Sequence, residues 1–85
     1  MEEFTFSKHS IEQMRNRNIS MEIVLKILED PKEIIFENER TIYQSIVSFE
    51  NEKEYLVRII VNSLKNPKTV ITVYKTSKLK KYYES

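Results

Sequence analysis

Residues 54–76 read EYLVRIIVNSLKNPKTVITVYKT, and their pattern indicates a pair of strands. Two runs rich in β-branched and aromatic residues, 54–62 and 69–76, stand on either side of a polar connection at residues 65–68. Such runs are typical of strands, and a connection of this length and polarity is typical of a hairpin. The stretch therefore predicts two neighbouring antiparallel strands.

The same pattern continues toward the N-terminus. Residues 33–37 (EIIFE) and 41–49 (TIYQSIVSF) have the composition of strands, and short polar connections separate them, with asparagine in place of glycine. Residues 3–6 (EFTF) can add a fifth strand at an edge. We therefore expect an antiparallel sheet of four strands, or five with this addition.

Two helices are predicted ahead of these strands, over residues 8–17 and 21–29. Each follows a serine, Ser7 or Ser20, whose hydroxyl can accept a hydrogen bond from an amide of the first turn. The second helix has an apolar face and stops at the Asp30-Pro31 pair. Two N-terminal helices packed on an antiparallel sheet make an α+β fold, and 85 residues suffice for one domain, residues 1–85.

The composition excludes several classes of site. The chain has no cysteine, so it can form neither a disulfide nor a thiolate zinc site, and its single histidine, His9, cannot form a histidine-rich metal site. No apolar stretch approaches the roughly 20 residues that span a bilayer, and no basic segment precedes an apolar run at the N-terminus. We therefore expect a cytoplasmic domain without metal, cofactor or membrane association.

The charges are distributed unevenly along the chain. Residues 1–39 contain nine acidic and five basic side chains, whereas residues 40–85 contain four acidic and nine basic ones. A group of lysines near the end has no carboxylate among its members: Lys75, Lys78, Lys80 and Lys81. This segment suits an anionic partner such as nucleic acid, and a solvated lysine tail is the alternative.

Three side chains are candidates for chemistry. His9 is predicted to be the second residue of the first helix, and histidine is the side chain best suited to proton transfer near neutral pH. Arg58 stands between apolar neighbours in a predicted strand, so it either pairs with a buried carboxylate or faces a functional cleft. Tyr74 offers a ring for stacking on bases and a hydroxyl for phosphate contacts. For His9, a solvated surface position without a role is the alternative.

Alternation along the strands assigns these side chains to faces of the sheet. Val57 and Ile59 belong to an apolar row, so Arg58 faces the other way. In the last strand the row Val70, Thr72, Tyr74 and Thr76 is predicted to share one face. We therefore expect Arg58, Tyr74 and Thr76 to lie together on a mixed face and to open onto one concavity with the Lys78 region.

Two motifs in the chain resemble a known family. They are Lys8-His9 leading to Arg15-x-Arg17-x-Ile19-Ser20, and the segment TVYKTSK at residues 72–78. Both resemble the small bacterial family named domain of unknown function 4258, over about residues 6–83. That family is akin to the RelE, BrnT and barnase-like ribonucleases, which include toxins of toxin–antitoxin pairs. The resemblance implies a RelE-like fold of two helices and four strands.

The resemblance also assigns positions. The residues that match the family's pattern are His9, Arg15, Arg17, Tyr74, Thr76, Ser77, Lys78 and Lys81. Relatives often have arginine where this chain has Gln13, and they tend to have glycine at Asn18. If that arginine binds the scissile phosphate, catalysis in this protein is weakened or altered.

The function expected from these observations is metal-independent RNA cleavage, in which a ribose 2′-hydroxyl attacks the adjacent phosphate. His9 would act as acid or base, Arg58 and Arg17 would stabilise the phosphate charge, and Tyr74 and Thr76 would position the strand. Basic side chains would hold the RNA backbone: Arg15, Lys78, Lys80 and Lys81. The expected partners are RNA, free or bound to the ribosome, and an antitoxin protein.

Two alternatives stay open. One is a noncatalytic module that docks nucleic acid or an acidic protein on the same basic face. The other is a protein-interaction domain that forms a homodimer through an exposed strand.

Overall fold

The computed structural model describes residues 3–79. Its elements follow the chain in this order: β1 (Phe4–Phe6), α1 (Lys8–Asn16), α2 (Met21–Glu29), β2 (Glu33–Glu37), β3 (Arg40–Ser48), β4 (Glu54–Asn62) and β5 (Lys68–Thr76). The predicted α+β fold, with two helices ahead of the main strands, is confirmed. No helix among these residues is long and apolar enough to cross a membrane.

Both helices begin where their serines predict. The Ser7 hydroxyl accepts a hydrogen bond from the amide of Ser10 at 3.1 Å, and the Ser20 hydroxyl accepts one from the amide of Ile23 at 3.2 Å. Asn18, in the turn between the helices, has a φ of 53°. Asparagine tolerates this left-handed conformation better than most residues, so the turn forms without glycine.

The sheet has five strands in the order β1-β5-β4-β3-β2. Strands β2 to β5 are antiparallel to their neighbours, as predicted, but β1 pairs with β5 in the parallel direction. The expectation of an antiparallel fifth strand was wrong. Short connections join β2 to β3, β3 to β4 and β4 to β5, and they enforce antiparallel pairing of these neighbours. Strands β1 and β5 come from opposite ends of the chain, so no hairpin sets their relative direction.

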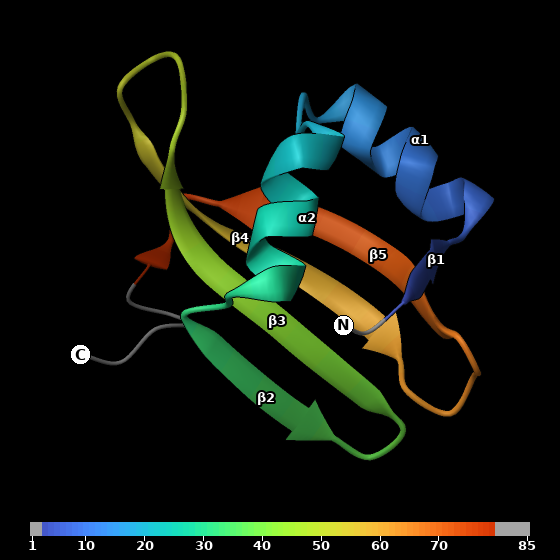
Figure 1. Ribbon diagram of the computed structural model, residues 1–85. Coiled ribbons are helices and arrows are strands. Elements are labelled where there is room, and N and C mark those ends of the chain that lie inside the picture. Colours follow the sequence, from blue (N-terminus) through green and yellow to red (C-terminus); the bar gives the residue numbers. More distant parts are fainter. Residues whose placement is uncertain (1–2, 80–85) are drawn as a thin grey trace.

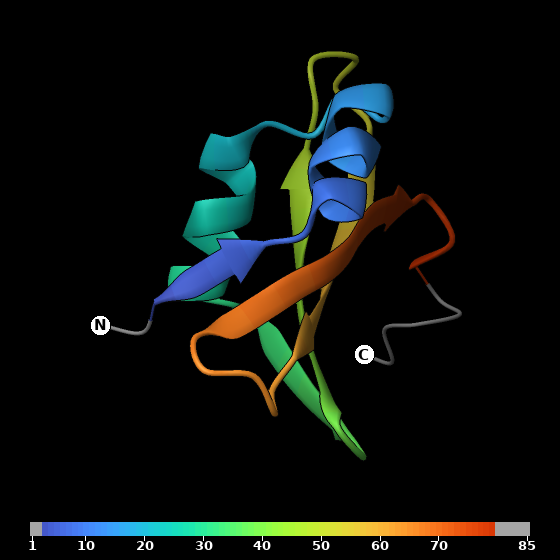
Figure 2. The same cartoon turned by 90° about the vertical axis from the view of Figure 1, so that its right-hand side faces the viewer.

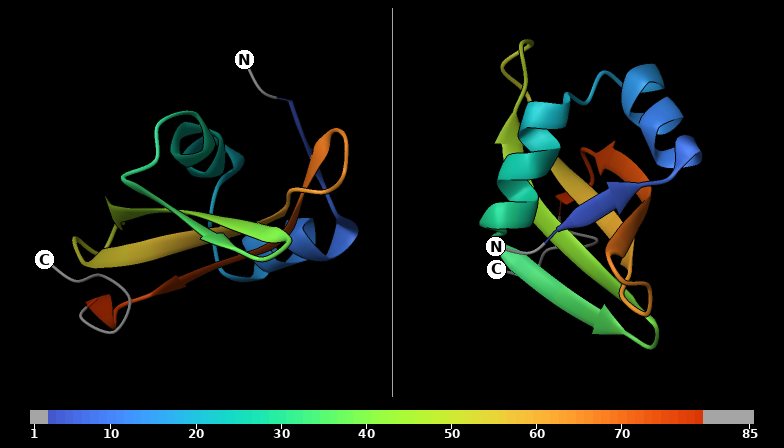
Figure 3. Two further views of the ribbon diagram at one scale, coloured as in Figure 1. Left: turned by 90° about the horizontal axis from the view of Figure 1, so that it is seen from below. Right: turned by 45° about the vertical axis from the view of Figure 1, so that its right-hand side comes forward.

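The two helices occupy different parts of the fold (Figure 1). Helix α2 lies across one face of the sheet, in front of β3, and α1 runs beside β5. In the view of Figure 2, α2 stands on one side of the strands, and Figure 3 shows the same layering from below. The face of the sheet that α2 covers is called the helix face here, and the opposite one the far face.

The core lies between the helices and the helix face. Its buried apolar side chains are Met14, Ile19, Val24, Ile27, Leu28, Tyr43, Val57, Ile59, Val61, Val70 and Val73. The predicted apolar row of β4 is thus confirmed for Val57 and Ile59, and Val61 continues it. Leu56, which alternates with them, is also fully buried.

One predicted row in β5 was wrong. Val70 was assigned to the same face as Thr72, yet it is fully buried in the helix-face core. The register shifts between Ile60 and Val61, so that Ile60 pairs with Thr72 and Val61 pairs with Val70. An extra residue at such an irregularity reverses the alternation beyond it, and only the half of β5 from Thr72 onward keeps the predicted faces.

Candidate functional site

Four polar side chains form a row across the far face, one from each of β2, β3, β4 and β5. They are Glu33, Gln44, Arg58 and Tyr74, and the strand register pairs each with the next. Their sequence neighbours in β3 and β4, including Tyr43, Val57 and Ile59, belong to the helix-face core. Because side chains alternate along a strand, the four polar ones face the other way. We call this set the transverse row.

Hydrogen bonds join the transverse row from end to end. Gln44 donates from Nε2 to Glu33 Oε1 at 2.5 Å, and its Oε1 accepts from Arg58 Nε at 2.9 Å. Arg58 Nη1 donates to the hydroxyl of Tyr74 at 2.5 Å, and the guanidinium carbon lies 5.7 Å from the centre of the Tyr74 ring. The Arg58 guanidinium is therefore held on two sides, by a buried amide and by a phenol.

The placement of Arg58 bears on the two alternatives that its sequence position left open. Arg58 lies on the far face and is partly buried, and its hydrogen bonds to Gln44 and Tyr74 are with uncharged groups. The carboxylate of Glu33 reaches it only through Gln44. Arg58 therefore does not lie on the helix-covered face of the sheet.

The end of β5 adds polar groups beside the row. Thr76 is opposite Leu56 in the register and lies on the same face as Tyr74, and its hydroxyl accepts a hydrogen bond from the amide of Lys78 at 3.1 Å. The Lys78 side chain is exposed. The structure therefore brings together Arg58, Tyr74 and Thr76, as predicted. Lys80 and Lys81 lie outside the described residues.

Helix α1 contributes two side chains to the backbone of β5. The amide of Val73 donates to Gln13 Oε1 at 3.0 Å, and Arg17 Nη1 donates to the Val73 carbonyl at 2.8 Å. These residues are four apart and so lie on one side of the helix. Sequence reasoning missed this role for Gln13, and it expected Arg17 to contact phosphate, whereas the structure gives Arg17 a backbone carbonyl as partner.

The other predicted residues of α1 are separated from the transverse row. His9 is exposed and lies one turn before Gln13 on the same side of the helix. None of the described hydrogen bonds joins it to Arg58 or Tyr74. Arg15 lies on another side, at a shallow pocket of about 350 Å³ beside Met14 and Ile19. The structure therefore separates Arg15 from Arg17, which the sequence motif placed together.

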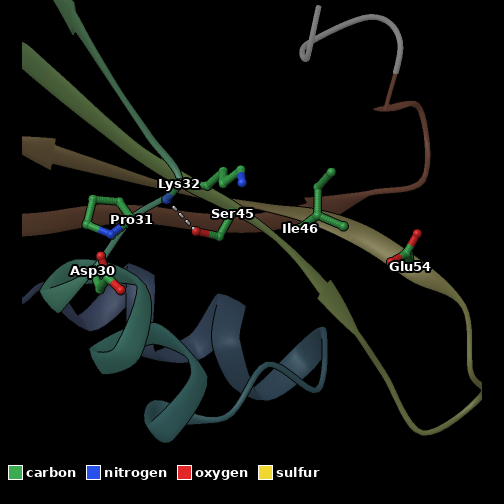
Figure 4. A pocket seen from close by; sticks show the side chains of 6 residues that line it. All are labelled: Asp30, Pro31, Lys32, Ser45, Ile46 and Glu54. Atoms are coloured by element: carbon green, nitrogen blue, oxygen red, sulfur yellow. Dashed lines mark hydrogen bonds between the residues drawn. The ribbon is translucent and has the colours of Figure 1, made fainter. Parts of the chain in front are cut away.

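Two larger pockets formed by described residues lie away from the transverse row. One, of about 500 Å³, is lined by Asp30, Pro31, Lys32, Ser45, Ile46 and Glu54, and in Figure 4 the amide of Lys32 donates to the Ser45 hydroxyl, at 2.8 Å. The other, of about 580 Å³, includes Lys75, whose ammonium lies 4.1 Å from the centre of the Phe49 ring. Neither contains Arg58 or Tyr74, so neither is the predicted concavity. Within residues 3–79, no three His, Asp or Glu side chains group as a metal site requires.

Comparison with known proteins gives one positive result. No curated protein and no solved structure matches the chain. A family model matches residues 6–75, which are most of the chain and include both helices, the transverse row and almost all of β5. The chain therefore belongs to the family described as Domain of unknown function (DUF4258).

Proposed function

We propose that this protein is an endoribonuclease that binds RNA on the far face and cleaves it without a metal ion. The observation that carries the proposal is the arginine–tyrosine pair of the transverse row, with its 2.5 Å hydrogen bond between Arg58 Nη1 and the Tyr74 hydroxyl. An arginine held in a fixed orientation is suited to a phosphate, because its planar fork matches two phosphate oxygens.

The proposed reaction uses the RNA itself as nucleophile. The ribose 2′-oxygen attacks the adjacent phosphorus and loses its proton to a base, while the bond from phosphorus to the 5′-oxygen breaks and that oxygen takes up a proton. The products are a 2′,3′-cyclic phosphate and a 5′-hydroxyl. The protein has to supply a base, an acid and stabilisation of the extra negative charge on the phosphoryl oxygens.

The described side chains suggest a division of these roles. Arg58, which Gln44 orients through Nε, would stabilise the developing charge. The Tyr74 hydroxyl accepts from Arg58, so its own proton can be donated to a phosphate oxygen or to the leaving group. Thr76 and Lys78 would contact the RNA backbone beyond the reacting phosphate. His9 would accept the proton from the 2′-hydroxyl, with the RNA bridging from the far face to α1.

The family resemblance supports the biological part of the proposal. We infer a cytoplasmic toxin of a toxin–antitoxin pair, akin to the RelE and BrnT group, acting on free or ribosome-bound RNA and inhibited by an antitoxin protein. Coexpression of the chain with its genomic neighbour, with growth and RNA integrity as readouts, tests this part.

The sharpest test of the chemistry uses Tyr74→Phe, which removes one oxygen and keeps the ring beside Arg58. Purified protein should cleave end-labelled RNA in the presence of a chelator and leave a 2′,3′-cyclic phosphate. Tyr74→Phe and His9→Ala should each lower the rate by roughly 10²- to 10⁴-fold, the usual range for a proton-transfer group. Lys26→Ala, a change of an exposed cation on α2, is the matched control and should retain most of the activity.

A binding module without catalysis is the second candidate, and the position of His9 favours it. The described residues place this histidine on α1, with no described hydrogen bond to the arginine–tyrosine pair. If the protein binds RNA but leaves it intact with ribosomes present, and His9→Ala changes nothing, the binding module replaces the enzyme. Arg58→Ala should then weaken RNA binding more than Arg15→Ala does.

A further inference from the structure

The edge of the sheet formed by β2 is open. Among residues 3–79, β2 is last in the strand order and pairs with β3 alone, so within this part of the chain its outer backbone groups have no strand partner and can accept another chain. Figure 3 shows β2 on the outer side of β3 with no strand beyond it. An extended peptide can add to such an edge, because backbone hydrogen bonds supply affinity and alternate side chains supply specificity.

Apolar side chains project from this edge strand. Phe36 is 79% exposed and Ile34 is 42% exposed, and both point to the helix face, because Ile34 pairs with the core residue Tyr43 and Phe36 lies two residues further along. Phe36 and Ile34 therefore form a small exposed apolar surface beside the open edge, which an added strand can cover.

The surroundings of the strand are acidic. Residues 29–39 contain five carboxylates and one lysine, and all of these charged side chains are exposed. Glu33 and Glu37 alternate with Ile34 and Phe36, so they project from the opposite side of β2. A strand added beside β2 would therefore meet apolar groups on one face and carboxylates on the other.

A second copy of this chain fits the edge poorly. If two β2 strands paired in antiparallel fashion about Ile35, Glu33 of each would lie opposite Glu37 of the other. Like charges directly opposite each other destabilise an antiparallel pair. A segment with lysine or arginine at those positions would instead form opposite-charge pairs.

We propose that the β2 edge is a docking site for an extended segment of another protein, in which basic and apolar residues alternate. Its basic side chains pair with Glu33 and Glu37, and its apolar side chains pack on Ile34 and Phe36. This site shares Glu33 with the transverse row but does not include the arginine–tyrosine pair, and it does not depend on RNA cleavage.

The probe is a synthetic nine-residue peptide that alternates lysine with valine, and the control is the same peptide with glutamate in place of lysine. Titration of the lysine peptide into the isotope-labelled full chain should shift the backbone amide signals of β2 and leave those of β1 unchanged. The glutamate peptide should produce no such shift.

Two variants distinguish specific peptide binding at the β2 edge from nonspecific hydrophobic association. Phe36→Ser should weaken the lysine peptide by about tenfold or more, as loss of a central aromatic contact does. Leu64→Ser, which removes an apolar side chain that is 70% exposed in the β4–β5 connection, is the matched control and should leave the affinity unchanged. The signal pattern of each free variant shows whether its fold is retained.

Three results would overturn the proposal. The first is the absence of any shift in the β2 signals at millimolar lysine peptide. The second is equal binding of the two peptides. The third is a stable dimer of the unliganded chain, measured by sedimentation, that Phe36→Ser abolishes, since the edge would then serve a second copy.

Discussion

The two edge regions of the sheet, along β5 and along β2, differ in how their outer backbone groups are covered. Along β5 the outer backbone is covered: β1 pairs with Lys68 to Val70, and then Gln13 and Arg17 bind the amide and carbonyl of Val73. Along β2 no described strand or helix continues the sheet, and Phe36 is mostly exposed. Within residues 3–79, α1 and β1 thus cover the β5 edge, whereas the β2 edge has its shortness and its carboxylates as protection.

The β5 edge therefore contributes to the stability of the domain, whereas the β2 edge is left for interaction with a partner. The β5 edge is built into the core, because α1 contributes Met14 to the buried cluster while its other side binds the strand backbone. The β2 edge contributes little to that core, since only Ile35 and Pro31 in its vicinity are partly buried. Substitutions at the two edges should therefore have very different costs.

The largest expected effect is at the β5 edge. Met14→Ala removes a side chain that is 5% exposed and should lower the free energy of unfolding by about 2–5 kcal/mol. Phe36→Ala removes a larger side chain at the open edge and should change it by no more than about 0.5 kcal/mol. Urea denaturation of both variants measures the contrast, and similar losses would show that the two edges are equivalent.

The next effect concerns the transverse row, which connects the two edges. Gln44→Leu keeps the approximate size of a fully buried side chain but removes its bonds to Glu33 and Arg58. Because a partly buried arginine then loses a partner, we expect a loss of about 1–3 kcal/mol in unfolding free energy. Under the proposed function, the rate of RNA cleavage should fall as well, with little change in RNA affinity. An unchanged stability would mean that the row contributes no net energy.

A smaller effect is expected from the side chains that seal β5. Gln13→Ala and Arg17→Ala each remove one hydrogen bond to Val73 and should each cost about 1 kcal/mol. Hydrogen exchange of the Val73 amide should accelerate in Gln13→Ala. Arg15→Ala is the control, and its denaturation curve should match that of the unmodified chain. If Gln13→Ala does not affect the Val73 amide, the helix does not protect the edge.

The smallest effect is electrostatic and lies at the open edge. Glu37 is opposite Arg40 in the register, so Glu37→Lys places like charges opposite each other and should cost about 0.2–1 kcal/mol. Glu37→Gln removes the attraction without adding repulsion and should cost less. Denaturation in low and high salt provides the check, because salt screens charges on the surface. A cost that does not fall with added salt would point to packing instead.

Local signals predicted the larger part of the fold. The serines before each helix and the β-branched runs specify structure within a few residues, and their helices and strands are confirmed. Asparagine takes the left-handed position at Asn38 as predicted, but in the next connection that position falls on Glu52 instead of Asn51. The direction of β1 was not predictable in this way, because it depends on which strand from the distant end of the chain lies beside it. The register shift at Ile60 and Val61 also left no local signal, and it moved Val70 into the core.

In the candidate site, too, local patterns predicted some features, and others depend on contacts between distant parts of the chain. Alternation alone predicted that Arg58, Tyr74 and Thr76 share a face, because all three lie on one side of the register shift. The partners Glu33 and Gln44 were missed, since their approach to Arg58 depends on the pairing of three strands. Gln13 was read as a departure from the family pattern, and its bond to Val73 depends on how α1 packs beside β5.

The transverse row also favours one register of β3 against β4. If β3 slid along β4 by two residues, the apolar side chains would still face the core, so hydrophobic burial alone distinguishes such states poorly. Gln44 would then stand opposite Leu56 or Ile60 instead of Arg58, and its buried amide oxygen would lose the donor that it now has. In a chain whose central strands are nearly uniform in their apolar pattern, one buried amide thus selects a single alignment of the sheet.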